Sequence, residues 1–328
     1  MKRTAWMREA IAAGKEFHVM RQDKSAHNRK NLLWTAAVLT GIGTIVLSSA
    51  VVPAVPFLLL APWMLGSLFF SLFILVIHEC SHDMFILTDD KKKLRLWNRR
   101  IGQLFSAPFF TDYVKHWEEG HLVHHLRPCE ADDPQDRDPI TGWPLAARLL
   151  VLLTIPVSVL AFNPSNQYGF NPKRIALGVV AFIIPAVLAS VLIAWPAGIA
   201  VFLGMHVLQF LALLKKAQEH GGGLEHATDP LLRSRTYLYP LARFASPFHI
   251  NYHFEHHANF RVPWYHLPAY HARLKAIVPE HLQPWFFHSR YIDQAAGRFP
   301  PVDESLVYTN TPDSTPENNG DEVAPAAR

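Results

Sequence analysis

The chain has 328 residues, with 31 Lys and Arg against 27 Asp and Glu, so its formal net charge is +4 when the 19 histidines are counted as neutral. Half of the residues are hydrophobic and 18% are charged, which excludes a disordered chain and a protein that coats nucleic acid. Two cysteines are too few for a disulfide scaffold or a cysteine-held iron–sulfur cluster. The charges are missing from two long stretches, which indicates a multi-pass membrane protein with a large aqueous part.

The first uncharged stretch lies between Lys30 and His78 and is divided by the sequence Pro53-Ala-Val-Pro56. Its two apolar runs, residues 32–52 and 57–77, are each about as long as one bilayer crossing. They predict the first pair of membrane-spanning helices.

The second uncharged stretch lies between Arg174 and Lys215 and predicts two further spans, residues 175–194 and 199–214. We therefore expect four transmembrane helices in two hairpins. Because the short connections contain no Lys or Arg, the positive-inside rule places both termini on the cytoplasmic side. Residues 1–30 are too polar and basic to contain a signal-peptide core, and we predict a basic cytoplasmic segment there.

Two further apolar segments need a different interpretation. The run Leu149–Phe162 is too short for a crossing and contains Pro156, so we predict a helix in the interface or packed under the other helices. A crossing there would also put the histidine groups described next on opposite faces of the membrane. The segment Leu94–Val114, which overlaps the basic run Lys91–Arg100, predicts a surface segment, although the basic run is equally typical of a solvated loop.

The histidines carry most of the functional information. Residues three or four apart lie on one narrow face of a helix, which is the spacing that metal ligands need. The groups follow the second span, lie between the hairpins and follow the fourth span, so all of them could meet just beneath the membrane. Nine histidines are candidates: His78, His82, His121, His124, His125, His220, His253, His256 and His257.

Nine imidazoles are more than one zinc ion can use, whereas two metal ions with four or five ligands each would use them all. Imidazole binds iron, zinc, copper and nickel, so the ligand type alone does not select the metal. Neighbouring carboxylates could orient the rings by accepting their other N–H. Each of them is equally typical of a solvated helix residue, which is the favoured interpretation for Glu118 and Glu119. The candidates are Glu79, Glu219, Glu255, Glu118 and Glu119. The predicted fold is an all-α integral membrane protein whose cytoplasmic helical cap holds a histidine-rich dimetal site.

The same residues are compatible with two other functions. The sequence His78-Glu79-Cys80-Ser81-His82 is also the HExxH motif of zinc metalloproteases, in which the glutamate acts as the base. That interpretation leaves the other histidine groups unexplained. A metal transporter is a third hypothesis, but transport sites are typically at the membrane midplane rather than below the ends of the spans.

The pattern resembles the membrane-bound fatty acid desaturases and their hydroxylase relatives. That family has three histidine boxes, and here they are HECSH after the second span, HLVHH between the hairpins and HFEHH after the fourth span. The stretch from Asn251 to His257, followed by Val262-Pro-Trp-Tyr-His-Leu-Pro, is also similar to the C-terminal signature of the family. The resemblance covers approximately residues 30–280, within a predicted membrane domain of residues 31–300.

The resemblance implies two non-haem iron ions held by the nine histidines, with O₂ as co-substrate. In stearoyl-type members a ninth histidine follows the fourth span, and His220 occupies that place. Those members have an asparagine four residues earlier that holds a water near one iron, whereas this chain has Lys216. The implied reaction is the introduction of a C=C bond into a fatty acyl chain. Hydroxylation or oxidative decarboxylation of a lipid or hydrocarbon is the alternative, and no residue selects the substrate or its regiochemistry.

The electrons for such a reaction need a carrier. The chain contains no His-Pro-Gly-Gly haem-binding signature and no glycine-rich dinucleotide fingerprint, so we expect a separate ferredoxin or small cytochrome with its reductase. Such carriers are often acidic, and the basic run Lys91–Arg100 is a candidate docking surface. Residues 301–328 are rich in Pro, Asn, Thr, Asp and Glu and predict a disordered acidic tail.

Overall fold

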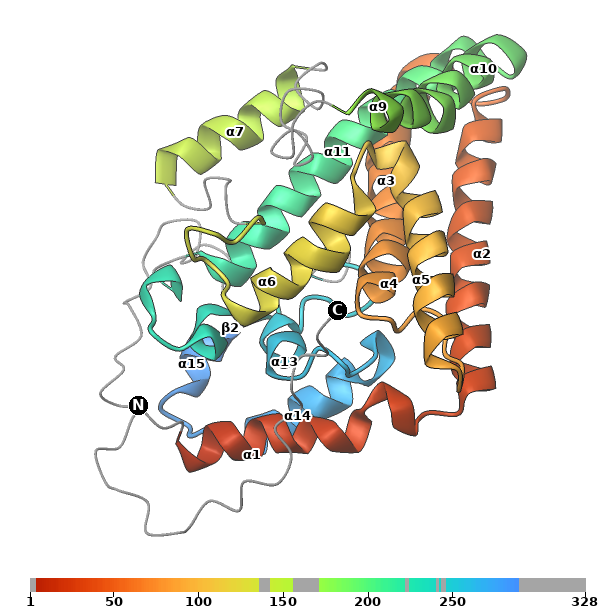
Figure 1. The fold of residues 1–328 in the computed structure, drawn as a ribbon. Coiled ribbons are helices and arrows are strands. Elements are labelled where there is room, and N and C mark those ends of the chain that lie inside the picture. The colour runs from red at the N-terminus through yellow and green to blue at the C-terminus, as the bar shows by residue number, and fades with distance from the viewer. Residues whose placement is uncertain are drawn as a thin grey trace.

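The computed structural model describes residues 4–135, 142–155, 171–221, 224–239, 242 and 246–288. Within these ranges the chain is mostly helical (Figure 1). Two short strands, β1 (Thr236–Tyr237) and β2 (Phe287–His288), pair in parallel.

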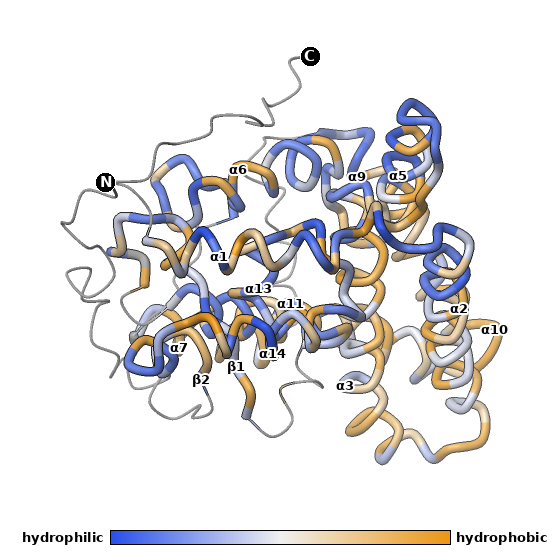
Figure 2. The backbone as a smooth tube through the Cα atoms, turned by 90° about the horizontal axis from the view of Figure 1, so that it is seen from below, coloured by the Kyte–Doolittle hydropathy of each residue, from blue (hydrophilic) through white to orange (hydrophobic). Residues whose placement is uncertain are grey.

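Four long apolar helices form the body of the molecule, and each is long and apolar enough to cross a membrane. They confirm the predicted all-α membrane architecture. Figure 2 shows hydrophobic residues concentrated along α3 and α10. The spans are α2 (Lys24–Ser48); α3 (Ala54–Leu72) with its continuations η3 (Phe73–His78) and α4 (Glu79–Ser81); α9 (Pro172–Gly178) with η7 (Val179–Ile183) and α10 (Ile184–Leu192); and α11 (Trp195–His220).

The helices α3 and α11 form the inner pair of the bundle, and they approach closely through glycine. A Cβ atom added at Gly66 would lie 2.5 Å from Cβ of Val207, and one added at Gly204 would lie 2.9 Å from Cβ of Leu65. Such small residues allow helix backbones to pack closely within a membrane. The two outer spans are α2 and the span formed by α9, η7 and α10. They expose most of their surface, as lipid-facing helices do.

Two of the spanning helices begin or end at residues other than those at which the charge-free runs begin or end. The first helix begins at Lys24 rather than near residue 32, because the carboxylate of Asp23 accepts the backbone N–H of Ala26 and caps it. The fourth helix continues past residue 214 to His220, so His220 is the last residue of the spanning helix itself. A run without charges marks the apolar part of a helix, whereas the cap and the last hydrogen bonds decide where the helix ends.

A second core lies at one end of the span bundle and joins the two terminal parts of the chain. Met7 and Ala10 are buried there, and the Tyr270 hydroxyl donates a 2.7 Å hydrogen bond to the carbonyl of Ala10. The N-terminal helix therefore packs on the C-terminal cap. The elements are α1 (Ala5–Ala13), α13 (His253–Ala258), α14 (Leu267–Ile277) and α15 (Gln283–Phe286), with the short turns η1 (Gly14–Phe17), η2 (Val19–Arg21), η8 (Leu224–His226), η9 (Pro230–Arg233) and η10 (Trp264–His266).

The described part of the segment between the two span pairs contains five further helical elements. It contains α5 (Lys91–Ser106), η4 (Ala107–Phe109), η5 (Tyr113–Glu119), α6 (Gly120–Leu126) and α7 (Gly142–Thr154). Asn98 is buried on α5 and accepts the backbone N–H groups of Phe85 and Ile86, so this basic segment is a packed helix rather than a solvated loop. The helix α7 packs against α11. The predicted helix at 149–162 is described only to residue 155, and the predicted tail at 301–328 lies outside the described residues.

Candidate metal centre

The first two histidine boxes each follow a π-helical segment. The segment η3 ends at His78, the first residue of the first box, and η5 ends directly before α6, which carries the second box. The third box opens α13 at His253, and α11 ends on His220. Single π-helical turns within helices are frequent at functional sites because they shift the register of the residues that follow.

The structure brings all nine predicted histidines together in two buried groups. Within each group the candidate ligand atoms lie within 4.8 Å of one another. In the described part of the chain no other side chain joins either group, and Cys80 is buried in the apolar core instead. The first group contains His78, His82, His121, His125 and His256, and the second contains His124, His220, His253 and His257.

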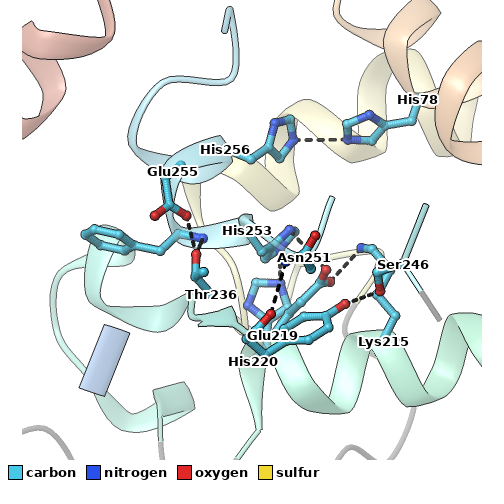
Figure 3. Close-up of polar contacts among 12 residues, drawn as sticks. His78, Lys215, Glu219, His220, Thr236, Ser246, Asn251, His253, Glu255 and His256 are labelled. Atoms are coloured by element: carbon cyan, nitrogen blue, oxygen red, sulfur yellow. Dashed lines mark hydrogen bonds and ion pairs between the residues drawn. The ribbon is translucent and has the colours of Figure 1, made fainter. Parts of the chain in front are cut away.

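The distances between imidazole nitrogens fit metal coordination. The Nε2 atoms of His78 and His256 are 3.0 Å apart, and those of His220 and His253 are also 3.0 Å apart (Figure 3). Two nitrogens that are both about 2.1 Å from one ion stand about 3.0–3.4 Å apart at angles between square and tetrahedral. In addition, Nε2 of His257 is buried without a hydrogen-bond partner among the described residues. An ion in each group would satisfy these atoms.

Three rings are held by acceptors that fix which nitrogen faces the group. Nδ1 of His124 lies 2.8 Å from Oδ2 of Asp133, Nδ1 of His121 lies 2.9 Å from Oε1 of Gln135, and Nδ1 of His220 lies 2.8 Å from the carbonyl oxygen of Arg233. Each partner atom can only accept, so Nδ1 carries the proton and Nε2 keeps its lone pair for a metal.

Two of the five carboxylates singled out from the sequence lie beside a box histidine. Glu79 Oε1 is 3.4 Å from Nδ1 of His78, and Glu219 Oε1 is 3.2 Å from Nδ1 of His253. The other three have other roles or none: Glu255 accepts from His271 and from Thr236, Glu118 pairs with Arg99, and Glu119 is exposed.

Sequence reasoning missed Asp133 and Gln135. Burial would raise the pKa of Asp133, but hydrogen bonds from His124 and from the amides of Gln135 and Cys129 outweigh it and lower the pKa to about 2. The carboxylate is therefore charged and acts as an acceptor at neutral pH. The only signal was its position shortly after the second box, and that signal does not distinguish Asp133 from its neighbour Asp132, which pairs with Arg127.

Burial, reinforced by the neighbouring imidazoles, favours the neutral form of three of the box histidines. It lowers the pKa of His82, His125 and His257 well below the ordinary value. Metal ions bind the neutral imidazole, so these three side chains are in the state that a metal requires.

A cavity of about 160 Å³ lies against both histidine groups. Five box histidines line it, together with apolar side chains that include Phe73 and Trp117, and with Arg148, Lys215 and Lys216. Lys215 donates a 2.6 Å hydrogen bond to Glu219 (Figure 3), and Lys216 donates to the carbonyl of Gln135. Lys216, which departs from the family pattern, thus reaches the loop that orients His121.

A larger cavity of about 470 Å³ lies among α2, α3, α5, α10 and α11, and every described side chain that lines it is apolar. Of the residues that line it, Leu39 and Leu104 are exposed and Phe109 is buried. The Phe73 ring lines the smaller cavity and contacts Phe109 of the larger one, with its centroid 5.8 Å from that of Phe109 and 4.8 Å from that of Trp117. We call Phe109, Phe73 and Trp117 the aromatic row.

In the described part of the chain, four apolar helices and two buried histidine groups at their ends define a multi-pass membrane protein with a candidate metal-binding site. The sequence profile described as "Fatty acid desaturase" matches residues 52–289, which is more than half of the chain. The chain therefore belongs to the fatty acid desaturase family, whose members are desaturase- and hydroxylase-type oxidoreductases acting on lipids. Curated proteins gave no significant match.

Proposed function

We propose that this protein is an O₂-dependent membrane oxidoreductase that introduces a C=C bond into a fatty acyl chain at a centre of two non-haem iron ions. The observation that carries the proposal is the pair of buried histidine groups, both adjoining one cavity. The group with five histidines would hold one ion and the group with four would hold the other. We assign iron to the centre because imidazole binds iron and the family implies it.

With iron bound, the centre would use O₂ and two electrons to remove hydrogen from an unactivated C–H bond. The chain's own residues set the geometry of that step. Asp133, Gln135 and the Arg233 carbonyl hold three rings in place, and Phe73 and Trp117 line the cavity in which the reacting carbon would lie. Hydroxylation or oxidative decarboxylation on the same centre is the alternative outcome, decided by which hydrogen or bond lies nearest.

The arrangement favours an oxidative centre over the two other hypotheses. A catalytic zinc takes three protein ligands and keeps one position open, but His78 and His82 share their group with three further histidines. Glu79 lies beside His78 rather than facing an open position. Both groups lie at the ends of α3 and α11, not at their midpoints, where a transport site is expected.

The same proposal includes the topology and the partners. We place both termini and the histidine groups on the cytoplasmic side of the bilayer, on the charge asymmetry of the sequence. Residues 31–300 would form the membrane domain, preceded by a basic segment, residues 1–30, and followed by an acidic tail, residues 301–328. A separate ferredoxin or small cytochrome, with its reductase, would deliver electrons, and the exposed cations of α5 would receive it.

Metal content per chain tests the proposal. Detergent-purified protein from iron-supplemented cells is compared with a His124→Ala/His256→Ala variant, which removes one ligand from each group. We expect close to two irons per chain in the native protein and a large loss in the variant. Lipid profiles of the expressing cells then report the product, either a new double bond or an alcohol.

Zinc in place of iron, at one ion per chain and retained in the double variant, would overturn the proposal. A Glu79→Gln variant supplies a second discriminator. It should spare metal binding in a desaturase, whereas in a metalloprotease it would abolish peptide hydrolysis while leaving zinc bound.

A further inference from the structure

The five-histidine group is contacted from two directions. His78 and His121 line the cavity of about 160 Å³, whereas His82 and His125 are not among the described residues that line it. The ring of Phe260, shortly after the third box, stacks on this second pair. Its centroid lies 5.2 Å from that of His82 and 5.1 Å from that of His125, with interplanar angles of 28° and 39°. The substrate and Phe260 would therefore meet the same group through different histidines.

Phe260 connects this group to the surface of the molecule. It is partly exposed, whereas all five histidines of the group are buried. Trp117 also contacts the group, but it is buried and lines the cavity. The next residue, Arg261, donates a hydrogen bond to the carbonyl of His82 and so holds its loop against the first box. Phe260 is therefore an aromatic link between the histidines and the solvent.

Arginines of α5 lie beside this loop. Asp83 follows His82 directly, and its carboxylate lies 3.9 Å from Nε of Arg95. Arg99 is one turn further along α5 and pairs with Glu118 at 2.9 Å. Both arginine side chains are more than half exposed, whereas the two carboxylates are mostly buried. The cations of these pairs therefore face the solvent.

The N-terminal segment adds a further cation. Val19 of η2 donates its backbone N–H to the carbonyl of Arg261 at 2.9 Å, and the exposed Arg21 belongs to the same turn. One partly exposed aromatic ring thus lies in a surface that is rich in arginine. We call this surface the entry patch, and it contains Phe260, Arg261, Arg21, Arg95 and Arg99.

The charge of the entry patch and its closeness to the histidines together specify a partner. A basic surface attracts an acidic protein, and redox encounters typically use small interfaces. Resting on the proposed function, we propose that the entry patch is the docking surface of an acidic one-electron carrier protein and that its electron passes through Phe260 to His82 and His125. This narrows the docking site from the whole basic run of α5 to Arg95 and Arg99, and adds residues of the cap.

The electron count follows from the proposed reaction. Each docked carrier is oxidised by one electron, which reduces one bound iron ion from the ferric to the ferrous state. Two carriers in turn supply the two electrons that the reaction needs. With one O₂ and two protons, the substrate loses two hydrogen atoms to form the double bond, and two waters are released. Phe260 lies between carrier and imidazoles and is unchanged at the end.

Reduction kinetics test the docking surface. The iron-loaded protein in detergent is mixed with a reduced plant-type two-iron ferredoxin or a reduced soluble cytochrome b5, and the absorbance of the carrier reports its oxidation. We expect Arg95→Gln/Arg99→Gln to lower the bimolecular rate about tenfold at low ionic strength and to weaken its salt dependence. The matched control, Arg273→Gln/Lys275→Gln, removes the same charge from exposed positions of α14 and should leave the rate nearly unchanged.

Two substitutions test the ring. Phe260→Ala should lose most of the reduction by the carrier, and Phe260→Tyr, which keeps an aromatic ring, should retain it. Dithionite, a small reductant that needs no docking surface, should reduce the iron of every variant at the native rate. This second reductant separates electron entry from a purely structural role, because a displaced His82 or His125 would alter both reactions.

A carrier-driven rate that is unchanged in either Arg95→Gln/Arg99→Gln or Phe260→Ala would overturn the proposal. Equal losses with the carrier and with dithionite would overturn it as well. Iron content is measured on the same samples, so that this failure is distinguishable from failure of the proposed function. Iron that dithionite reduces, at a carrier-driven rate insensitive to the entry patch, refutes only the docking surface. Absence of iron refutes the centre and this inference with it.

Discussion

His124 and Asp133 form a buried pair in which Nδ1 of the imidazole lies 2.8 Å from Oδ2 of the carboxylate. The same carboxylate accepts the amide of Cys129 at 3.0 Å and, through Oδ1, the amide of Gln135 at 2.8 Å. The loop after the second box is thus folded around Asp133. One side chain both orients a ring of the four-histidine group and holds the loop that carries Gln135.

Removal of this carboxylate should weaken metal binding without removing a ligand. We expect Asp133→Ala to lower the metal affinity about 10–100-fold, as is typical when the partner of a ligating histidine is lost. Titration with a chelator, monitored by the metal retained on the protein, measures this change. Asp132→Ala is the matched control, because Asp132 is half exposed and pairs with Arg127 rather than with a histidine. Equal losses in both variants would contradict the assigned role.

The two histidine groups should be separable by mutation. His256→Ala removes a ligand from the five-histidine group and His257→Ala one from the four-histidine group. Each variant should lose mainly one of the two ions, so that about half of the native metal content remains in each. Elemental analysis of purified protein measures it, with the exposed His281→Ala as control. Complete loss in either variant would show that the groups bind metal only together.

The contact between α3 and α11 predicts that alanine substitutions at two glycines have different effects on the stability of the protein. A Cβ atom at Gly66 would lie 2.5 Å from Cβ of Val207, whereas one at Gly43 on α2 would have nothing within 4 Å. Gly66→Ala should destabilise the protein by about 1–3 kcal/mol through overpacking. Gly43→Ala should be neutral or stabilising by up to about 1 kcal/mol, because alanine is the better helix former. Thermal unfolding in detergent, followed by a thiol-reactive dye, compares the two.

Removal of the metals should loosen the cap rather than the whole molecule. The nine histidines come from the end of η3, the residue after α4, the end of α11, and from α6 and α13, so bound ions would tie the second box and the third box to the spans. A metal that binds only the folded state stabilises it, and chelation removes that contribution. We expect hydrogen exchange to rise in α6 and α13 after chelation and to stay unchanged in α2. Exchange rates in α6 and α13 that are the same before and after chelation would contradict this expectation.

The sequence predicted the features that depend on composition and spacing. Missing charges located the four spans, and histidines three or four residues apart predicted which side chains would meet. Features that depend on long-range packing were not accessible. The docking of α1 on α14 through Ala10 and Tyr270, the helix start at the Asp23 cap, and the choice of Asp133 over Asp132 are all decided by contacts between distant or adjacent residues that leave no periodic signal.

The π-helical segment η3 separates two requirements that a single α-helix would couple. Residues 54–72 must present their small and apolar faces to α11, while His78 and His82 must turn toward the other boxes. One extra residue in the helix rotates everything after it by about 100° without changing the span before it. The orientation of the helix in the bilayer and the aim of its histidines can therefore vary independently. Loss of a single residue from 73–77 would leave a helix that still crosses the membrane but turns both imidazoles away from the centre.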